Sequence, residues 1–247
     1  MQSPSADDIL RQMKDAYAAH STYRDQGEVV TVFDPGKPNS FTKVQLFFTL
    51  FIRPDRFRYD FRERRRTTEP SWRHDAILAF GPSVAEYSNW HEKKPCASVH
   101  LALAGVSNMV PTMLMPKPIR AVDRSSSYPS SVVGQEEINA ELCDIVERRE
   151  PLDSQRRLWI GRETRLLRRV EQTFVITRAR MAEMDRWEDE MLNRDNPRRP
   201  RKPLNRFPPI DRPPFTVDMT TLYRPVVINA PIEAEEFERD LPQEGLP

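Results

Sequence analysis

Residues 56–64 read Arg-Phe-Arg-Tyr-Asp-Phe-Arg-Glu-Arg, so that aromatic and charged side chains alternate along the chain. Successive side chains of a β-strand point to opposite faces of the sheet, and this alternation predicts a strand with one face on a core and one in water. Phe57, Tyr59 and Phe61 share the core side, where each ring buries about 150–250 Å². Such a face needs a cover, which we expect to be helices or a bound ligand. The charged residues of the opposite face are predicted to be solvated.

The segments around this strand have the same two-residue period. In residues 41–52 every second residue from Val44 to Ile52 is apolar, including Phe48 and Leu50, and we expect this side to face the core. No strand–helix–strand rhythm is present, which favours a mainly antiparallel sheet of about nine or ten strands. The other strands are predicted over 23–34, 73–80, 84–90, 131–136, 141–149, 157–160, 166–177 and 215–228.

Two segments are predicted to be helical. Residues 5–20 have one apolar face at helical spacing, and Ser5 can cap the first turn. Residues 97–115 are apolar without alternation, and we predict a helix that is broken by Pro111. Methionine either fills cores or adapts to varied ligands. The apolar residues of this segment, among them Leu101, Met109 and Met113, are therefore core residues or ligand contacts.

The charges of the chain nearly cancel, with 38 Lys and Arg against 37 Asp and Glu. Attraction to nucleic acid or to a membrane must therefore come from local patches. Residues 195–214 hold seven prolines and six basic residues against two acidic ones, which predicts an extended or disordered loop. This loop is part of a charged insertion at about 178–214, which either contacts anionic lipid or an acidic partner or stays solvated.

The usual motifs of the large enzyme classes are missing from the sequence. None of the seven glycines is spaced as in a phosphate-binding or dinucleotide-binding loop. His91, Cys96 and His100 lie close together, but Pro95 interrupts a shared helix face and no fourth metal ligand is evident. In residues 56–64 the arginines and the aromatic rings fall on opposite faces, which argues against base stacking. We therefore expect no catalytic residues, no cofactor, no metal and no nucleic-acid partner.

The cellular location follows from the apolar runs and the cysteines. No run of about 18 apolar residues occurs, so no segment is expected to span a bilayer. The first residues lack the basic and apolar regions of an export signal, so the chain is either cytosolic or a mature form whose signal has been removed. The short polar start before the first helix favours the second, and we expect a periplasmic or otherwise exported chain. Cys96 and Cys143 either form one disulfide there or remain two buried thiols.

Short phrases in three parts of the chain follow one another in a distinctive order. They are Ile52-Arg53-Pro54-Asp55-Arg56-Phe57-Arg58-Tyr59, then Leu158-Trp159-Ile160-Gly161 with Leu166-Leu167-Arg168-Arg169, and finally Asn229-Ala230-Pro231-Ile232 with Phe237 and Pro242. In this order and spacing the chain resembles the LolA-like superfamily of periplasmic lipoprotein carriers, which includes outer-membrane lipoprotein-sorting relatives. The similarity spans roughly residues 6 to 242.

The resemblance implies a single LolA-like α+β domain over 1–247. Its expected fold is an open, strongly curved, mainly antiparallel sheet, a half-barrel, with helices covering the concave face. The apolar cavity between them would hold the acyl chains of a lipid or lipoprotein. In such carriers an arginine near an early strand can hold the lid, and Arg53 and Arg56 are the candidates. The residues expected to line the cavity are Phe48, Leu50, Phe57, Tyr59, Phe61, Leu101, Met109, Met113, Val170 and Phe174.

The expected function is therefore a non-catalytic periplasmic carrier that exchanges its lipid or lipoprotein with a membrane-protein donor or acceptor. The alternative is an envelope sensor or scaffold that binds a protein partner, or an anionic membrane surface, through its outer face and basic loop. The insertion at about 178–214 is longer than the usual connection in the family, and this keeps the alternative open.

Overall fold

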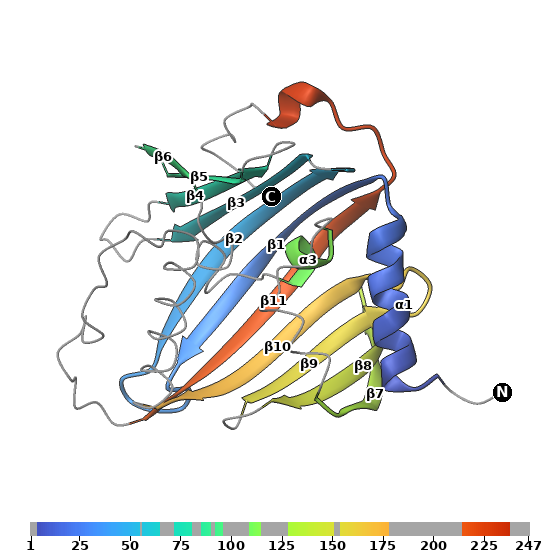
Figure 1. Cartoon of the computed structure of the whole chain (residues 1–247). Helices are drawn as coiled ribbons and strands as arrows, with labels where there is room; N and C mark the ends of the chain where they lie inside the picture. The colour runs from blue at the N-terminus through green and yellow to red at the C-terminus, as the bar shows by residue number, and fades with distance from the viewer. Residues whose placement is uncertain are drawn as a thin grey trace, which may run out of the picture.

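Figure 1 shows the computed structural model of the chain, in which two helices pack against one large sheet. Helix α1 (Ala6–Ala19) precedes the sheet, the short helix α3 (Met109–Leu114) lies in mid-chain, and the 3-10 turn η2 (Ala234–Phe237) follows the last strand. The structure describes residues 4–54, 56–64, 72–80, 85–89, 92–95, 109–114, 128–150, 154–177 and 214–237. Within these residues, no helix has the length and apolar character needed to cross a membrane.

The strands form one antiparallel sheet in the order β6-β5-β4-β3-β2-β1-β11-β10-β9-β8-β7. The two end strands, β6 and β7, do not pair with each other, so the curved sheet is open. This confirms the predicted class, an open and mainly antiparallel sheet with few helices. The strands are β1 (Thr22–Phe33), β2 (Phe41–Ile52), β3 (Arg56–Arg64), β4 (Trp72–Phe80), β5 (Ala85–Asn89), β6 (Glu92–Pro95), β7 (Ser130–Ile138), β8 (Glu141–Glu150), β9 (Ser154–Gly161), β10 (Leu167–Ile176) and β11 (Phe215–Ile228).

Strands that are neighbours in the described sheet are also consecutive in the sequence, except at the pair β1–β11. Strands β1 to β6 form one meander and strands β7 to β11 form a second. Strand β1 joins the two meanders by pairing with β11 over nearly its whole length, from Tyr23 opposite Ile228 to Phe33 opposite Val217. The first and last described strands therefore lie side by side in the middle of the sheet (Figure 1).

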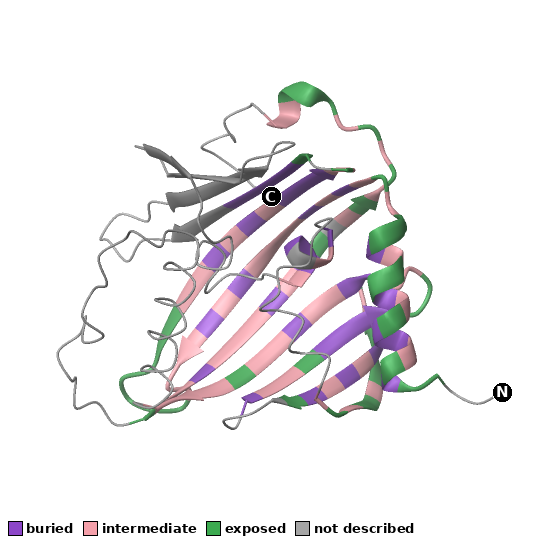
Figure 2. Cartoon of the chain, in the orientation of Figure 1, coloured by how far each residue is buried: buried purple, intermediate pink, exposed green. Residues whose placement is uncertain are grey.

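One face of the sheet, here called the core face, carries Tyr23, Phe47 and Tyr59, which are almost fully buried. Buried positions alternate with less buried ones along the central strands, as Figure 2 shows. Phe57 and Tyr59 lie on the core face, as the alternation in β3 predicts. Phe61 pairs with Phe47 in the β2–β3 register, although its side chain lies outside the described part of the chain.

The face predicted for β2 is wrong by one residue. Phe47, Thr49 and Phe51 lie on the core face, because they stand opposite Gly27, Asp25 and Tyr23 of β1. Phe48 and Leu50 consequently point to the outer face. Both faces of β2 are rich in apolar residues, so the hydrophobic pattern alone favoured the wrong side, whereas the register with β1 decides it.

Both helices contribute to the core on this face. In α1 the apolar residues Ile9, Met13 and Tyr17 are buried, and the Ser5 side chain accepts a hydrogen bond from the Asp8 amide as its N-cap. In α3 the buried residues are Val110 and Leu114. The prediction that Pro111 breaks this helix is wrong, because proline in the first turn removes an amide that has no intrahelical partner. Leu101 and the rest of 97–108 lie outside the described residues.

The outer face of β3 is less solvated than the alternation predicts. Arg58 and Asp60 are 2% and 1% exposed and form an ion pair at 2.8 Å. Arg58 also donates to the carbonyl of Glu236 at 3.0 Å, and the Glu236 carboxylate pairs with Arg24 of β1. The chain after β11 therefore binds the outer face of the first meander, where Leu50 is also buried.

Candidate functional site

The upper half of the core face is a cluster of packed aromatic rings, some stacked and some edge-to-face. The Phe47 ring centroid lies 5.9 Å from that of Tyr59 and 5.4 Å from that of Tyr223. Phe57 extends the cluster and lies 6.5 Å from Tyr59. Because β1 has a glycine, Gly27, directly opposite Phe47, the phenyl ring packs against bare backbone. These contacts come from four neighbouring strands and pack this half of the face closely.

A carboxylic acid, Asp25, is buried within this aromatic wall. Its Oδ2 accepts a hydrogen bond from the Tyr23 hydroxyl at 2.6 Å. Burial raises the pKa of Asp25 to about 6, although the Thr49 and Tyr23 hydroxyls favour the charged form. Burial, followed by the nearby Asp25, raises the pKa of Tyr23, which therefore keeps its proton and donates. Sequence reasoning missed Asp25, because a carboxylate in a strand is usually assigned to the solvated face.

Helix α1 is attached to the sheet at its C-terminal end. The Tyr17 hydroxyl accepts a hydrogen bond from the Leu167 amide at 3.1 Å, where the β9–β10 register shifts. Burial raises the pKa of this hydroxyl, and its ring lies 5.5 Å from that of Tyr23. From the other meander, Arg53 donates to the carbonyls of His20 and Tyr17 at 2.9 and 3.0 Å. Both halves of the sheet thus hold the same end of the helix.

Arg53 is the arginine that contacts a helix, whereas Arg56, the second candidate, is exposed at the start of β3. We expect Arg53→Ala to lower the free energy of unfolding by about 1–3 kcal/mol, because two charge-assisted hydrogen bonds to the helix carbonyls are lost. Arg56→Ala is the matched control and should change it by less than about 0.5 kcal/mol. Urea unfolding followed by circular dichroism measures both, and equal effects would show that Arg53 does not hold α1.

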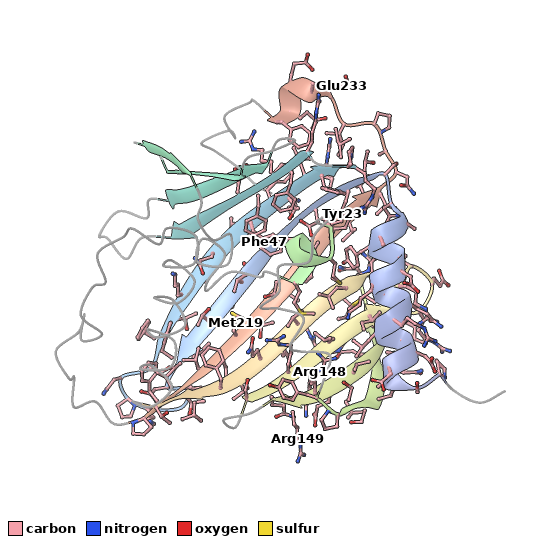
Figure 3. All side chains as sticks on the ribbon, viewed as in Figure 1. Tyr23, Phe47, Arg148, Arg149, Met219 and Glu233 are labelled. Atoms are coloured by element: carbon pink, nitrogen blue, oxygen red, sulfur yellow. The ribbon has the colours of Figure 1, made fainter. Side chains whose placement is uncertain are left out.

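The lower end of the core face is apolar but incompletely buried. The rings of Phe33 and Phe41 stack at 4.3 Å, and the Phe215 centroid lies 6.4 Å from that of Phe33. Phe41 is 42% exposed, and Phe33, Phe174 and Phe215 are half-buried. Val217, which is buried, and Met219 connect this end to the aromatic cluster along β11. Figure 3 shows Met219 between Phe47 and the lower end of the sheet.

The structure brings only part of the predicted cavity set together. Phe57, Tyr59, Val170 and the half-buried Phe174 are on the core face, and Met109 and Met113 pack against its core cluster from α3. Phe48 and Leu50 are on the outer face, for the reason given by the register. The residues that the sequence reasoning did not name are Tyr23, Asp25, Phe47, Phe51, Tyr223 and the phenylalanines of the lower end.

Cys143 is buried and carries a free thiol, so within the described residues it is not part of a disulfide. Burial raises the pKa of this thiol to about 11. Its sequence-predicted partner, Cys96, lies outside the described residues, as do His91 and His100. Among the residues that the structure does describe, no three His, Cys, Asp or Glu side chains gather as a metal site.

No protein-family model matches the chain, and no curated protein matches it. Solved structures with a similar arrangement include the lipoprotein LppX of Mycobacterium tuberculosis, with 10% identity, a TM-score of 0.39, and coverage of 92% of this chain and 97% of that one. The MucA/MucB complex of Pseudomonas aeruginosa matches at 10% identity and a TM-score of 0.45, covering 95% of this chain and 61% of that one. A LolA superfamily protein of Nitrosomonas europaea matches at 10% identity and a TM-score of 0.28, covering 97% and 96%.

The arrangement of this chain is thus similar to that of a solved LolA superfamily protein. This is the family that the sequence phrases resemble.

Proposed function

We propose that this chain is a non-catalytic carrier outside the cytoplasm that binds the acyl chain of a lipid or lipoprotein on its core face. The observation that supports the proposal is the mainly apolar lane along this face. It runs from the buried aromatic cluster around Phe47, past Met219 and Val217, to the half-exposed rings at Phe33 and Phe215.

A lane of this form suits a long hydrocarbon chain better than a compact solute. Burial of each CH₂ group contributes about 0.8 kcal/mol, so a chain of sixteen or eighteen carbons gains more as more of it lies along the strands. The half-exposed rings at the lower end give such a chain an apolar place to enter. Helices α1 and α3, which pack against the same core cluster, would cover part of the inserted chain.

The test is native mass spectrometry of the purified chain, followed by displacement of a fluorescent fatty-acyl probe. The double variant Phe41→Arg/Phe174→Arg places two charges in the lane. We expect it to weaken probe binding at least 10-fold, because a guanidinium group loses hydration in an apolar site. The double variant Thr42→Arg/Thr173→Arg is the matched control. Thr42 and Thr173 are the immediate sequence neighbours of Phe41 and Phe174 in the same strands, and they therefore face outward.

Saturable binding near one-to-one that is lost in the first variant and kept in the second would support the carrier. Absence of binding to the wild-type chain, with no lipid in the native mass spectrum, would contradict it. Equal losses in both variants would place the probe away from the core face and would also contradict it.

A further inference from the structure

Four buried oxygen atoms on the core face stand out because they are incompletely paired in the described structure. Gln45 Oε1 and Thr221 Oγ1 have no hydrogen-bond partner, and Asp25 Oδ1 and Thr49 Oγ1 have none except each other. Their residues are at most 3% exposed, so water does not reach them from the surface. The atoms come from three neighbouring strands, so the incomplete hydrogen bonding is a feature of the whole site and not of a single side-chain rotamer.

The register arranges the four residues in two pairs. Thr49 stands directly opposite Asp25, while Gln45 and Thr221 flank Val29 on its two sides. The pairs are four residues apart along the strands, which corresponds to about 13 Å. Phe47 and Tyr223 lie between them and contact each other at 5.4 Å. Polar oxygens thus interrupt the apolar lane at two levels.

Folded proteins rarely bury an oxygen without a partner, because the lost hydrogen bond to water is not replaced. A wall that had to be merely apolar would be more stable with valine or leucine at these positions. All four atoms can accept a hydrogen bond, and the two threonine hydroxyls can also donate. The wall therefore has more hydrogen-bond acceptors than donors.

We propose that the lipid bound on the core face carries hydrogen-bond donors along its chain, as a hydroxylated acyl chain does, and that Gln45, Thr221, Thr49 and Asp25 select it over an unsubstituted chain. The inference rests on the proposed function and adds the ligand class. A neutral hydroxyl group fits this wall better than an ammonium group, because a cation would lose its hydration among the aromatic rings.

The probes are stearic acid, 3-hydroxystearic acid and 12-hydroxystearic acid. Stearic acid has no hydroxyl group, whereas each hydroxy acid can place its hydroxyl group at one of the two polar levels of the lane. We expect the wild-type chain to bind at least one hydroxy acid about 5-fold more tightly than stearic acid, as one net hydrogen bond implies. In Gln45→Leu/Thr49→Val/Thr221→Val this preference should fall below about 2-fold, while stearic acid still binds. Thr220→Val, the outward-facing neighbour of Thr221, should keep the preference.

Each of the remaining outcomes would contradict the inference for a different reason. Equal binding of all three acids by the wild-type chain would leave the carrier intact and refute the selection. A preference that survives in the triple variant would place the recognition elsewhere. A clear drop in the Tm of the ligand-free triple variant would show that the oxygens already have partners in the folded protein. If no acid binds at all, the proposed function fails together with the inference.

Discussion

Replacing Gly27 by alanine is expected to lower the free energy of unfolding by about 3 kcal/mol. A Cβ atom at this position would collide with the Leu222 carbonyl oxygen of β11 and with the Phe47 ring of β2. The carbonyl belongs to backbone that pairs with β1, so it cannot move without disturbing the β1–β11 ladder. The Phe47 ring is held by Tyr59 and Tyr223 and cannot retreat either.

Gly134→Ala is a matched control for this prediction. Both glycines lie in strands beside a register shift, but a Cβ atom on Gly134 would meet only the Ile145 Cδ1 atom, at an ordinary 3.7 Å. We expect Gly134→Ala to change the free energy of unfolding by less than about 1 kcal/mol. Urea unfolding of the two variants measures the difference. Similar values for both would mean that Phe47 and the β11 backbone yield to the added methyl group.

The second large effect expected is a dependence of stability on pH that Asp25→Asn removes. The pKa of Asp25 is about 6 in the folded chain against an ordinary value of 3.8. Between these values the folded state binds more protons than the unfolded state, so the free energy of unfolding falls as pH rises. The contribution of Asp25 is fully present below about pH 4 and is lost as pH rises through 6. Each pKa unit corresponds to about 1.4 kcal/mol, so the loss is about 3 kcal/mol.

The asparagine variant has no charge to desolvate, and its amide oxygen can still accept from Tyr23. We therefore expect Asp25→Asn to be more stable than the wild-type chain at pH 8 by up to about 3 kcal/mol, and to lose this advantage at pH 4. The measurement is urea unfolding of both chains from pH 4 to pH 8. The difference between the two curves isolates Asp25, because all other carboxylates titrate in both chains. A difference that does not change with pH would contradict the assigned burial.

The sequence predicted the elements of the fold well and the faces of the strands less well. The alternation in β3 predicted a strand with its aromatic residues on the core face, and the helical spacing in α1 predicted a helix with one apolar face. Both predictions are confirmed. In β2, by contrast, Val44 to Ile52 is a more hydrophobic set than Gln45 to Phe51, yet the second set lies on the core face. The side of β2 depends on its register with Tyr23 and Asp25, and single-strand patterns do not contain that information.

The polar part of the candidate site could not be predicted for a similar reason. Asp25, Gln45 and Thr49 are polar residues in amphipathic strands, where the default position of a polar side chain is in water. The one signal in the sequence is that Asp25 alternates in step with Tyr23, Gly27 and Val29 and so shares their face. The burial of Arg58 could not be predicted from β3 alone either, because its partner Glu236 lies 178 residues further along the sequence.

The pairing of β1 with β11 also governs the order in which the chain can fold. Each meander is built from hairpins between consecutive strands, which close short loops and form quickly. The β1–β11 seam instead joins residues as distant as Tyr23 and Ile228, and its ladder cannot begin until the last strand has been synthesised. The core that unites Tyr17, Tyr23 and Tyr223 is therefore completed only after β11 has been synthesised. Because the entropy of loop closure rises only with the logarithm of loop length, a long connection between β10 and β11 barely delays that final step.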